Sequence, residues 1–246
     1  MSVMQVTVAA PDDGRGSDPC QAEPMSDIRT ETVPLVDGSE LRLTVAEPDA
    51  AVRGGIVVLH DARGLTDAVR DLVQGFAGDG WIAVAPHLYH RDAADEVAAD
   101  QAKEQADRLD RDQIIADTDT AFGWLAERDV KADRMGVVGF DLGGAVALAV
   151  AATRTLGAAV TVGDEVSSAN LVELVSAEKG LTCPWLGIFG TDDPGIDRLR
   201  VAASSSEVAT DVVVYPGDGG HRFDDDPDTA AEARQRTLNW FDSHLR

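Results

Sequence analysis

Residues 134–144 have the sequence Arg-Met-Gly-Val-Val-Gly-Phe-Asp-Leu-Gly-Gly, and residues 145–152 continue as Ala-Val-Ala-Leu-Ala-Val-Ala-Ala. The first run is apolar and has the length of a strand, whereas the alanine-rich run favours a helix. Between them stands one polar side chain, Asp141, with glycines before and after it. Small residues allow the chain to turn very sharply here, because bulkier neighbours would clash. The pattern predicts a strained turn with Asp141 at its apex, next to the N–H groups that begin the helix.

Gly139, Asp141 and Gly143 match the Gly-x-nucleophile-x-Gly pattern of the nucleophile elbow in α/β-hydrolases. The residue at the apex is neither Ser nor Cys but Asp. The alternative interpretation is an ordinary tight connection between a strand and a helix, in which Asp141 only caps the helix. One short motif does not decide between the two, because such motifs also occur by chance.

The length and composition of the chain favour one large α/β domain. The chain has 246 residues, of which 44% are hydrophobic. Residues 1–26 lack periodicity and are rich in Pro, Asp, Gly and Ser, so we expect a flexible N-terminal tail followed by a single domain over residues 27–246. No apolar run approaches a membrane span and no secretory signal is visible, which predicts a soluble, cytoplasmic protein. Cys20 and Cys183 form no metal-like spacing, and we expect neither a disulfide framework, a metal nor a cofactor.

The chain is strongly acidic, with 44 acidic and 21 basic residues and a formal charge of −23. Such a surface repels nucleic acids and anionic membranes, so we expect a small-molecule substrate and neither of those partners. The sequence does not fix the oligomeric state. Many aspartates with few lysines suit a high-salt cytoplasm, and bias from a GC-rich genome explains them equally well.

Strand and helix patterns alternate along the chain. Alternating residues around Asp37-Gly38 predict an antiparallel hairpin over Thr32–Val36 and Leu41–Ala46. We further expect buried strands at Gly54–Leu59, Trp81–Ala85, 135–140, Gly157–Val162, Trp185–Phe189 and Asp211–Tyr215. Helices are expected at 66–78, where Thr66 is the cap, and at 92–128, 142–152, Leu171–Ala177 and Pro227–His244. This order predicts a mostly parallel sheet flanked by helices, with the hairpin at its N-terminal side.

Three polar side chains each follow the end of a predicted strand. Asp141, Asp193 and His221 occur in the order nucleophile, acid, histidine that α/β-hydrolases use. The carboxyl ends of parallel strands meet at one edge of the sheet, so the three side chains are expected to converge there. The elements together predict the α/β-hydrolase fold with a variant Asp-His-Asp triad.

Across nearly all of residues 30–245 the sequence resembles the dienelactone hydrolase family. The resemblance rests on five segments: His60-Asp61-Ala62-Arg63-Gly64-Leu65, Pro86-His87-Leu88-Tyr89, Gly139-Phe140-Asp141-Leu142-Gly143-Gly144, Gly190-Thr191-Asp192-Asp193-Pro194, and Tyr215-Pro216 with His221-Arg222-Phe223. In that family a Cys–His–Asp triad hydrolyses small lactones and esters.

The resemblance implies a role for each matching residue. Asp193 is implied as the acid and His221 as the base. The backbone N–H groups of Ala62 and Leu142 are implied as the oxyanion hole. Asp61 matches a family Glu that interacts with the nucleophile, and Tyr89 joins it among the residues expected to support the site or face the substrate.

The sequence departs from the family at three positions. Asp141 replaces the family's Cys, and Asp225 stands where the family has an arginine for the substrate carboxylate. A second family arginine aligns only loosely with Lys103. Dienelactone is an anion and is therefore not the expected substrate.

A carboxylate at the apex leaves several chemistries open. Carboxylates attack esters poorly, because a mixed anhydride must form, but they attack saturated carbons that carry a leaving group well, as in haloalkane dehalogenases and epoxide hydrolases. His221 could instead activate water directly, with Asp141 only orienting it. A hydrolase fold that has lost catalysis and binds a ligand or partner is a further alternative. Residues 92–110 are the only stretch available to cover the site.

Overall fold

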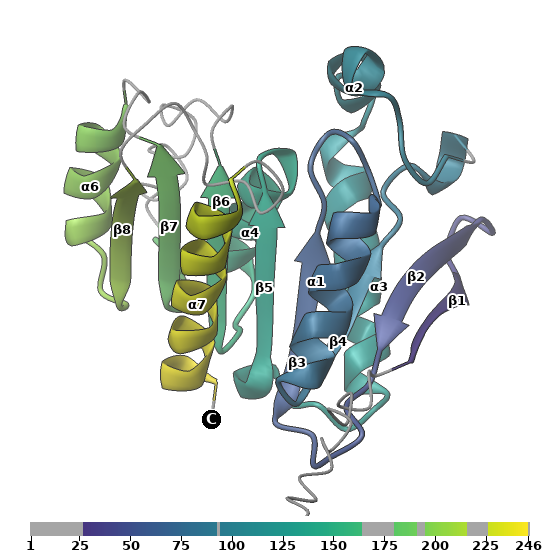
Figure 1. Cartoon of the computed structure of the whole chain (residues 1–246), viewed down its shortest axis with the longest axis horizontal. Helices are drawn as coiled ribbons and strands as arrows, with labels where there is room; N and C mark the ends of the chain where they lie inside the picture. Colours follow the sequence, from purple (N-terminus) through teal and green to yellow (C-terminus); the bar gives the residue numbers. More distant parts are fainter. Residues whose placement is uncertain (1–26, 93, 164–179, 191–194, 216–225, 246) are drawn as a thin grey trace, which may run out of the picture.

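The computed structural model describes residues 27–245 except 93, 164–179, 191–194 and 216–225. The predicted tail over residues 1–26 and the predicted helix at Leu171–Ala177 lie outside these residues. The described strands form one eight-stranded sheet in the order β1-β2-β4-β3-β5-β6-β7-β8 (Figure 1). Their bounds are β1 Ile28–Pro34, β2 Glu40–Ala46, β3 Gly54–Leu59, β4 Trp81–Pro86, β5 Met135–Phe140, β6 Ala158–Gly163, β7 Trp185–Gly190 and β8 Thr210–Tyr215.

The sheet is mostly parallel, as predicted. The hairpin of β1 and β2 is antiparallel, β2 also pairs antiparallel with β4, and the remaining pairs from β4 to β8 are parallel. The first strand was predicted at Thr32–Val36, but β1 begins earlier, at Ile28, and ends earlier, at Pro34. Strands β3 to β7 are buried along their whole length, which explains their continuous apolar runs.

Helices cover both faces of this sheet (Figure 1). One face packs against α1 (Asp67–Gly78) and α7 (Pro227–His244), and the other against α3 (Arg111–Ala126), α4 (Leu142–Thr153) and α6 (Ile196–Ser204). Thr66 caps α1 as predicted, and its side chain accepts a hydrogen bond from the N–H of Val69. Helix α6 was not predicted from the sequence.

The stretch predicted to be helical at 92–128 is helical only in part. It contains two helices, α2 (Ala99–Ala106) and α3, and is preceded by a short 3₁₀ turn, η1 (His90–Asp92). Asp110 supplies the physical reason, because its side chain accepts a hydrogen bond from the N–H of Gln113 and so begins a new helix. The break lets α2 leave the sheet, and α2 lies beyond the carboxyl ends of the parallel strands (Figure 1).

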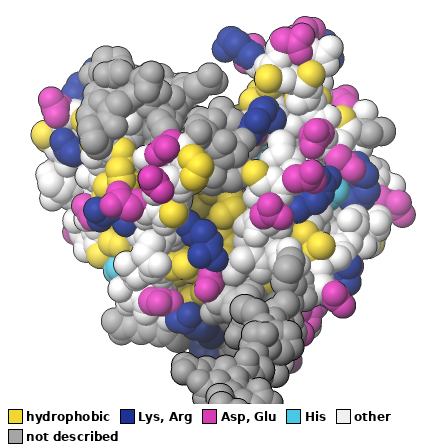
Figure 2. All heavy atoms as spheres, viewed as in Figure 1, with side chains coloured by type: hydrophobic (Ala, Val, Ile, Leu, Met, Phe, Trp, Pro, Cys, Tyr) yellow, Lys and Arg dark blue, Asp and Glu magenta, His cyan; other side chains and the backbone are white. Residues whose placement is uncertain are grey.

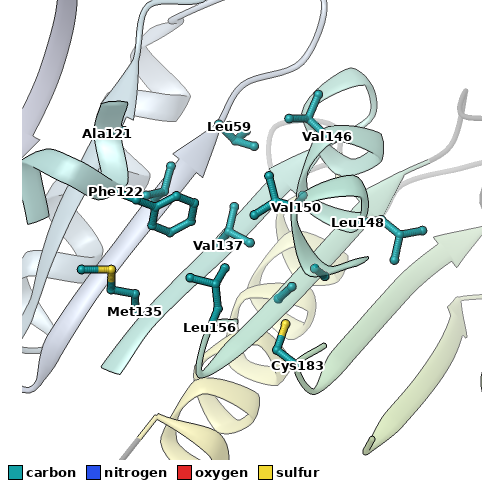
Figure 3. Close-up of a cluster of buried hydrophobic side chains, with 14 of the residues drawn as sticks. Leu59, Ala121, Phe122, Met135, Val137, Val146, Leu148, Val150, Leu156 and Cys183 are labelled. Atoms are coloured by element: carbon teal, nitrogen blue, oxygen red, sulfur yellow. The ribbon is translucent and has the colours of Figure 1, made fainter. Parts of the chain in front are cut away.

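The core on the α3 and α4 face packs the elbow strand against its own helix. Val137 on β5 lies beside Val150 on α4, with Phe122 of α3 next to them (Figure 3). Cys183 is buried in the same cluster as a free thiol. These contacts fix α4, and with it the turn that precedes α4.

The surface carries the acidic excess in dispersed form. Figure 2 shows acidic side chains scattered over the visible face and interspersed with Arg and Lys. Among the described residues, no helix has the length and apolar character needed to cross a membrane. Within that same part of the chain, no cluster of His, Cys, Asp and Glu side chains could hold a metal ion.

The turn between β5 and α4 depends on an approach of backbone segments that only glycine permits. A Cβ atom on Gly139 would collide with the carbonyl group of Gly143. A Cβ atom on Gly143 would lie 2.5 Å from the carbonyl oxygen of Leu59 and 2.7 Å from that of His60. The obstacles are backbone atoms that cannot rotate away. The glycines therefore set the distance between the elbow and the loop that follows β3.

We expect Gly143→Ala to lower the free energy of unfolding by about 3 kcal/mol or more, because overpacking against fixed backbone cannot relax. Urea unfolding followed by tryptophan fluorescence measures the change. Gly123→Ala is the matched control, since a Cβ atom at this helical position meets nothing within 4 Å. It should leave stability unchanged or raise it by up to about 1 kcal/mol. Equal stabilities for the two variants would contradict this view of the elbow.

Candidate active site

Asp141 has the strained backbone that a nucleophile elbow requires. Its φ is 47° and its ψ is −105°, and Asp129 is the other described non-glycine residue with a positive φ. Its N–H donates to the carbonyl of Val162 at 2.8 Å, and its own carbonyl accepts from Ala145 at 3.1 Å. The side chain is 4% exposed and makes no capping hydrogen bond to α4. An ordinary N-cap has extended backbone and a capping side chain, so that interpretation does not fit.

The carboxylate of Asp141 extends towards the end of β6. A Cβ atom built on Gly163 would lie 3.9 Å from the Oδ1 atom of Asp141. The N–H of Leu142, the first residue of α4, belongs to the helix N-terminus, where backbone donors have no partner within the helix. The predicted donor is therefore adjacent to the apex residue, as the sequence pattern requires.

The second predicted donor lies on the loop that follows β3. Asp61 is 2% exposed, and its Oδ1 atom accepts a hydrogen bond from the N–H of Arg63 at 2.8 Å. Its Oδ2 atom lies 3.6 Å from Nε of Arg63. The hydroxyl of Tyr89 donates to the carbonyl oxygen of Ala62 at 2.7 Å. Burial and the nearby carboxylates of Asp61 and Asp92 raise the pKa of Tyr89, so its hydroxyl stays protonated and acts as a donor.

The buried ring of His60 forms hydrogen bonds with backbone groups of this loop and of the segment after β4. Its ring is fully buried, its Nδ1 atom lies 2.7 Å from the carbonyl oxygen of Asp61, and its Nε2 atom lies 3.2 Å from the N–H of Leu88. A carbonyl only accepts and an N–H only donates, so Nδ1 carries the proton and Nε2 does not. Burial lowers the pKa of His60 to about 4, which agrees with a neutral ring.

A short segment after η1 is paired with the same loop. The N–H of Leu65 donates to the carbonyl of Asp95 at 2.7 Å, and Gly64 forms an antiparallel bridge with Glu96. His87 holds this segment through a 3.1 Å hydrogen bond between its Nδ1 atom and the Asp95 carboxylate. The segment leads directly into α2, so the loop after β3 and α2 are tied together.

The loop, the elbow and α2 enclose a cavity of about 160 Å³. Its lining is Asp61, Ala62, Arg63, Ala99, Ala102, Lys103 and Asp141. Two carboxylates and two cationic side chains thus share a small space. The stretch expected to cover the site contributes three of these residues through α2. Lys103, which aligns only loosely with the family arginine, lies at this cavity.

A larger and more open cleft of about 370 Å³ lies elsewhere, between α1 and α7. Its lining includes Asp71, Leu72, Ala230 and Arg234 but none of the predicted site residues. Its walls offer no nucleophile or base in a strained or buried setting. We therefore assign the candidate active site to the smaller cavity, which contains the elbow.

The structure brings together four of the predicted site residues: Asp141, Leu142, Asp61 and Ala62. Tyr89 contacts this group through the Ala62 carbonyl. Asp193 and His221 lie outside the described residues, as does Asp225, so the predicted triad stays a prediction.

The model of the dienelactone hydrolase family matches residues 41–245 of this chain. The chain belongs to the dienelactone hydrolase family. It is accordingly a hydrolase with the α/β-hydrolase fold, as the sequence pattern predicted. Family members are hydrolases of small molecules, which agrees with a site built around a small cavity.

Individual relatives agree with the family. A Yersinia pestis protein named as a carboxymethylenebutenolidase is 28% identical, and the match covers 87% of each chain. One from Methylorubrum extorquens with the same name is 30% identical over 85% of this chain and 78% of its own length. A crystal structure described as a dienelactone hydrolase from Klebsiella pneumoniae has a TM-score of 0.72 and 25% identity, covering 89% of this chain and all of the other.

Two residues of the candidate site, His60 and Arg63, were not predicted from the sequence. His60 enters the sequence analysis only as the first residue of a family segment, yet its side chain contacts the peptide before Ala62. Arg63 lines the cavity beside Asp61. Both belong to the first family segment, where His60 precedes Asp61 and Arg63 follows it by two residues. The segment therefore marked them, but it did not indicate the direction of either side chain.

Asp141→Gly should be more stable than the wild-type protein by about 1 kcal/mol, because glycine adopts a positive φ without strain. Asp141→Ala keeps the unfavourable φ and should not gain. Urea unfolding of the three proteins at neutral pH makes the comparison. An alanine variant as stable as the glycine variant would show that the gain comes from removing the buried carboxylate rather than from strain.

Stability should fall between about pH 6.5 and pH 4. The unfolded chain binds a proton at His60 near the ordinary pKa of 6.5, whereas burial delays this in the folded chain to about pH 4. Protons then favour the unfolded state, by up to about 3 kcal/mol from His60 alone. His87, whose pKa is also lowered mainly by burial, acts in the same direction.

Urea unfolding between about pH 7.5 and 4.5, at about 0.5 M NaCl to screen the acidic surface, tests this expectation. The His60→Asn variant should show a shallower dependence, because His87 is then the remaining described histidine with a lowered pKa. An identical pH dependence in both proteins would contradict a buried neutral His60.

Proposed function

We propose that this protein hydrolyses a small, uncharged ester, lactone or related substrate at the cavity beside Asp141, using Asp141, His221 and Asp193. The observation that carries the proposal is that Asp141, whose backbone has a strained positive φ, lines a cavity next to the oxyanion loop. The family membership supports it. Residues 27–246 would form one domain after the tail 1–26, and the protein would act in the cytoplasm.

Each of the three residues has a proposed role. Asp141 occupies the nucleophile position, His221 acts as base and Asp193 orients His221. The N–H groups of Ala62 and Leu142 stabilise the negative oxygen that forms at the substrate carbonyl. Attack by Asp141 on an ester breaks the carbonyl–alkoxide bond and leaves a mixed anhydride, which water then hydrolyses. This intermediate is high in energy, so ester turnover should be weak.

The charged side chains that line the cavity affect which substrate charge it can accept. Asp61 and Asp141 both line it, opposite only Arg63 and Lys103, and Arg63 lies 3.6 Å from Asp61. Asp225 stands at a family arginine position. An anionic substrate such as dienelactone would meet two carboxylates matched by two cations, with no surplus of positive charge in this lining to attract it. The cavity volume of about 160 Å³ further favours a small molecule.

A second candidate is attack by Asp141 on a saturated carbon, with release of halide or opening of an epoxide. The observation in its favour is the apex carboxylate itself, because carboxylates are good nucleophiles towards such carbons. A panel of small haloalkanes, haloacids and epoxides tests it alongside esters.

Asp141→Cys should raise the hydrolysis of p-nitrophenyl acetate at least about 10-fold over the wild-type protein, because a thiolate is a far better acyl-transfer nucleophile. The gain should stay incomplete, since the negative charge of Asp61 at the same cavity raises the thiol pKa. Initial rates at neutral pH measure the effect.

Asp141→Ala and His221→Ala are the controls, each checked for folding by circular dichroism. Strong wild-type turnover that survives Asp141→Ala but not His221→Ala would remove Asp141 as nucleophile and favour direct activation of water. Absence of turnover in every variant, including Asp141→Cys, would favour a protein that binds a ligand or partner without catalysis.

A further inference from the structure

His60 is a fully buried histidine outside the proposed triad. Both of its ring nitrogens are committed within the protein, Nδ1–H to the carbonyl of Asp61 and Nε2 to the N–H of Leu88. Its pKa is lowered by burial, so the ring does not gain a charge near neutral pH. The ring therefore has no nitrogen available to act as an acid or base on a substrate.

The geometry of the peptide group gives His60 a direct influence on Ala62. The carbonyl of Asp61 and the N–H of Ala62 belong to one planar peptide and point in opposite directions when it is trans, and no described peptide bond is cis. A hydrogen bond that fixes the carbonyl thus fixes the direction of the N–H. The N–H of Gly64 also donates to this carbonyl at 3.2 Å, but from within the same loop. The His60 ring also contacts the N–H of Leu88, so it ties this peptide to the segment that follows β4.

The peptide on the other side of Ala62 is fixed by Tyr89. The Tyr89 hydroxyl donates to the Ala62 carbonyl, and the Tyr89 ring lies against His60 with the ring centres 5.3 Å apart. The two side chains are 0% and 1% exposed. Ala62 is thus held through both of its peptides by two buried side chains that pack against each other.

We propose that His60 is a positioning residue that aims the Ala62 N–H into the cavity, with Tyr89 fixing the following peptide. The inference rests on the proposed function in one respect, that the Ala62 N–H binds the oxyanion. Such a donor stabilises the transition state only if it is already aimed before the charge develops. A loop peptide held by its neighbours alone could rotate, whereas a buried side-chain contact holds it in one orientation.

Steady-state kinetics with p-nitrophenyl acetate test the consequence, in the wild-type chain and in the Asp141→Cys background. His60→Leu should lower kcat about 10-fold or more while KM changes less than about twofold, because the lost interaction matters in the transition state. His60→Asn keeps an N–H donor near the position of Nδ1 and should recover most of kcat. A kcat for His60→Asn as low as that for His60→Leu would overturn the proposal.

Two controls separate positioning from general damage. His244 makes the same kind of bond, from Nδ1 to the carbonyl of Trp240 at 2.8 Å, near the end of α7. His244→Leu should leave kcat unchanged. Leu199→Ala in α6 removes a fully buried side chain and lowers stability away from the loop. A loss of kcat in Leu199→Ala equal to that in His60→Leu would mean that lowered stability alone explains the effect.

Amide NMR gives a readout that needs no turnover, so the proposed function and the positioning role can fail separately. In the wild-type chain, the ¹⁵N shifts of His60 should show the Nδ1–H tautomer. The Ala62 amide should exchange with solvent at least about 10-fold faster in His60→Leu than in His244→Leu. Tyr89→Phe should disturb the amides of Ala62 and Arg63. An Ala62 amide unchanged in His60→Leu would overturn the proposal whether or not the enzyme turns over esters.

Discussion

The close approach of the elbow to the loop after β3 is the constraint on which the site depends. Gly143 lies so near the carbonyl groups of Leu59 and His60 that a single Cβ atom would separate them. This contact sets the position of both predicted oxyanion donors, because Leu142 precedes Gly143 and Ala62 follows His60 by two residues. Asp141 lies two residues before Gly143 and has a positive φ, and the packing of α4 against β5 holds the turn in this strained conformation.

Other contacts of the site hold the loop after β3 in place next to the elbow. The buried side chains of His60 and Tyr89 form hydrogen bonds with this loop, and the segment around Asp95 pairs with its backbone. The same segment leads into α2, so the wall of the cavity and the loop are one connected unit. A disturbance at His87 or Asp95 would therefore reach the cavity through this loop and through α2.

The sequence predicted the parts of this structure that depend on local pattern. The buried strands, the cap at Thr66 and the elbow follow from apolar runs and small residues that have one physical interpretation. The break between α2 and α3 was missed because a charged stretch without Pro or Gly resembles one helix, although Asp110 is a good cap. The role of His60 was missed for another reason. Its direction is set by the pairing of β3 with β4, which brings Leu88 to the ring and is invisible in a single segment.

The peptides on either side of Ala62 are held by the side chains of His60 and Tyr89. The elbow glycines act on backbone atoms. Asp141 in place of the family's Cys alters the reacting group and the local charge. The charge opposes acyl transfer twice, because a carboxylate attacks esters poorly and repels the oxygen that becomes negative. We therefore expect the carboxylate of Asp141 to be the group that limits ester hydrolysis at this site.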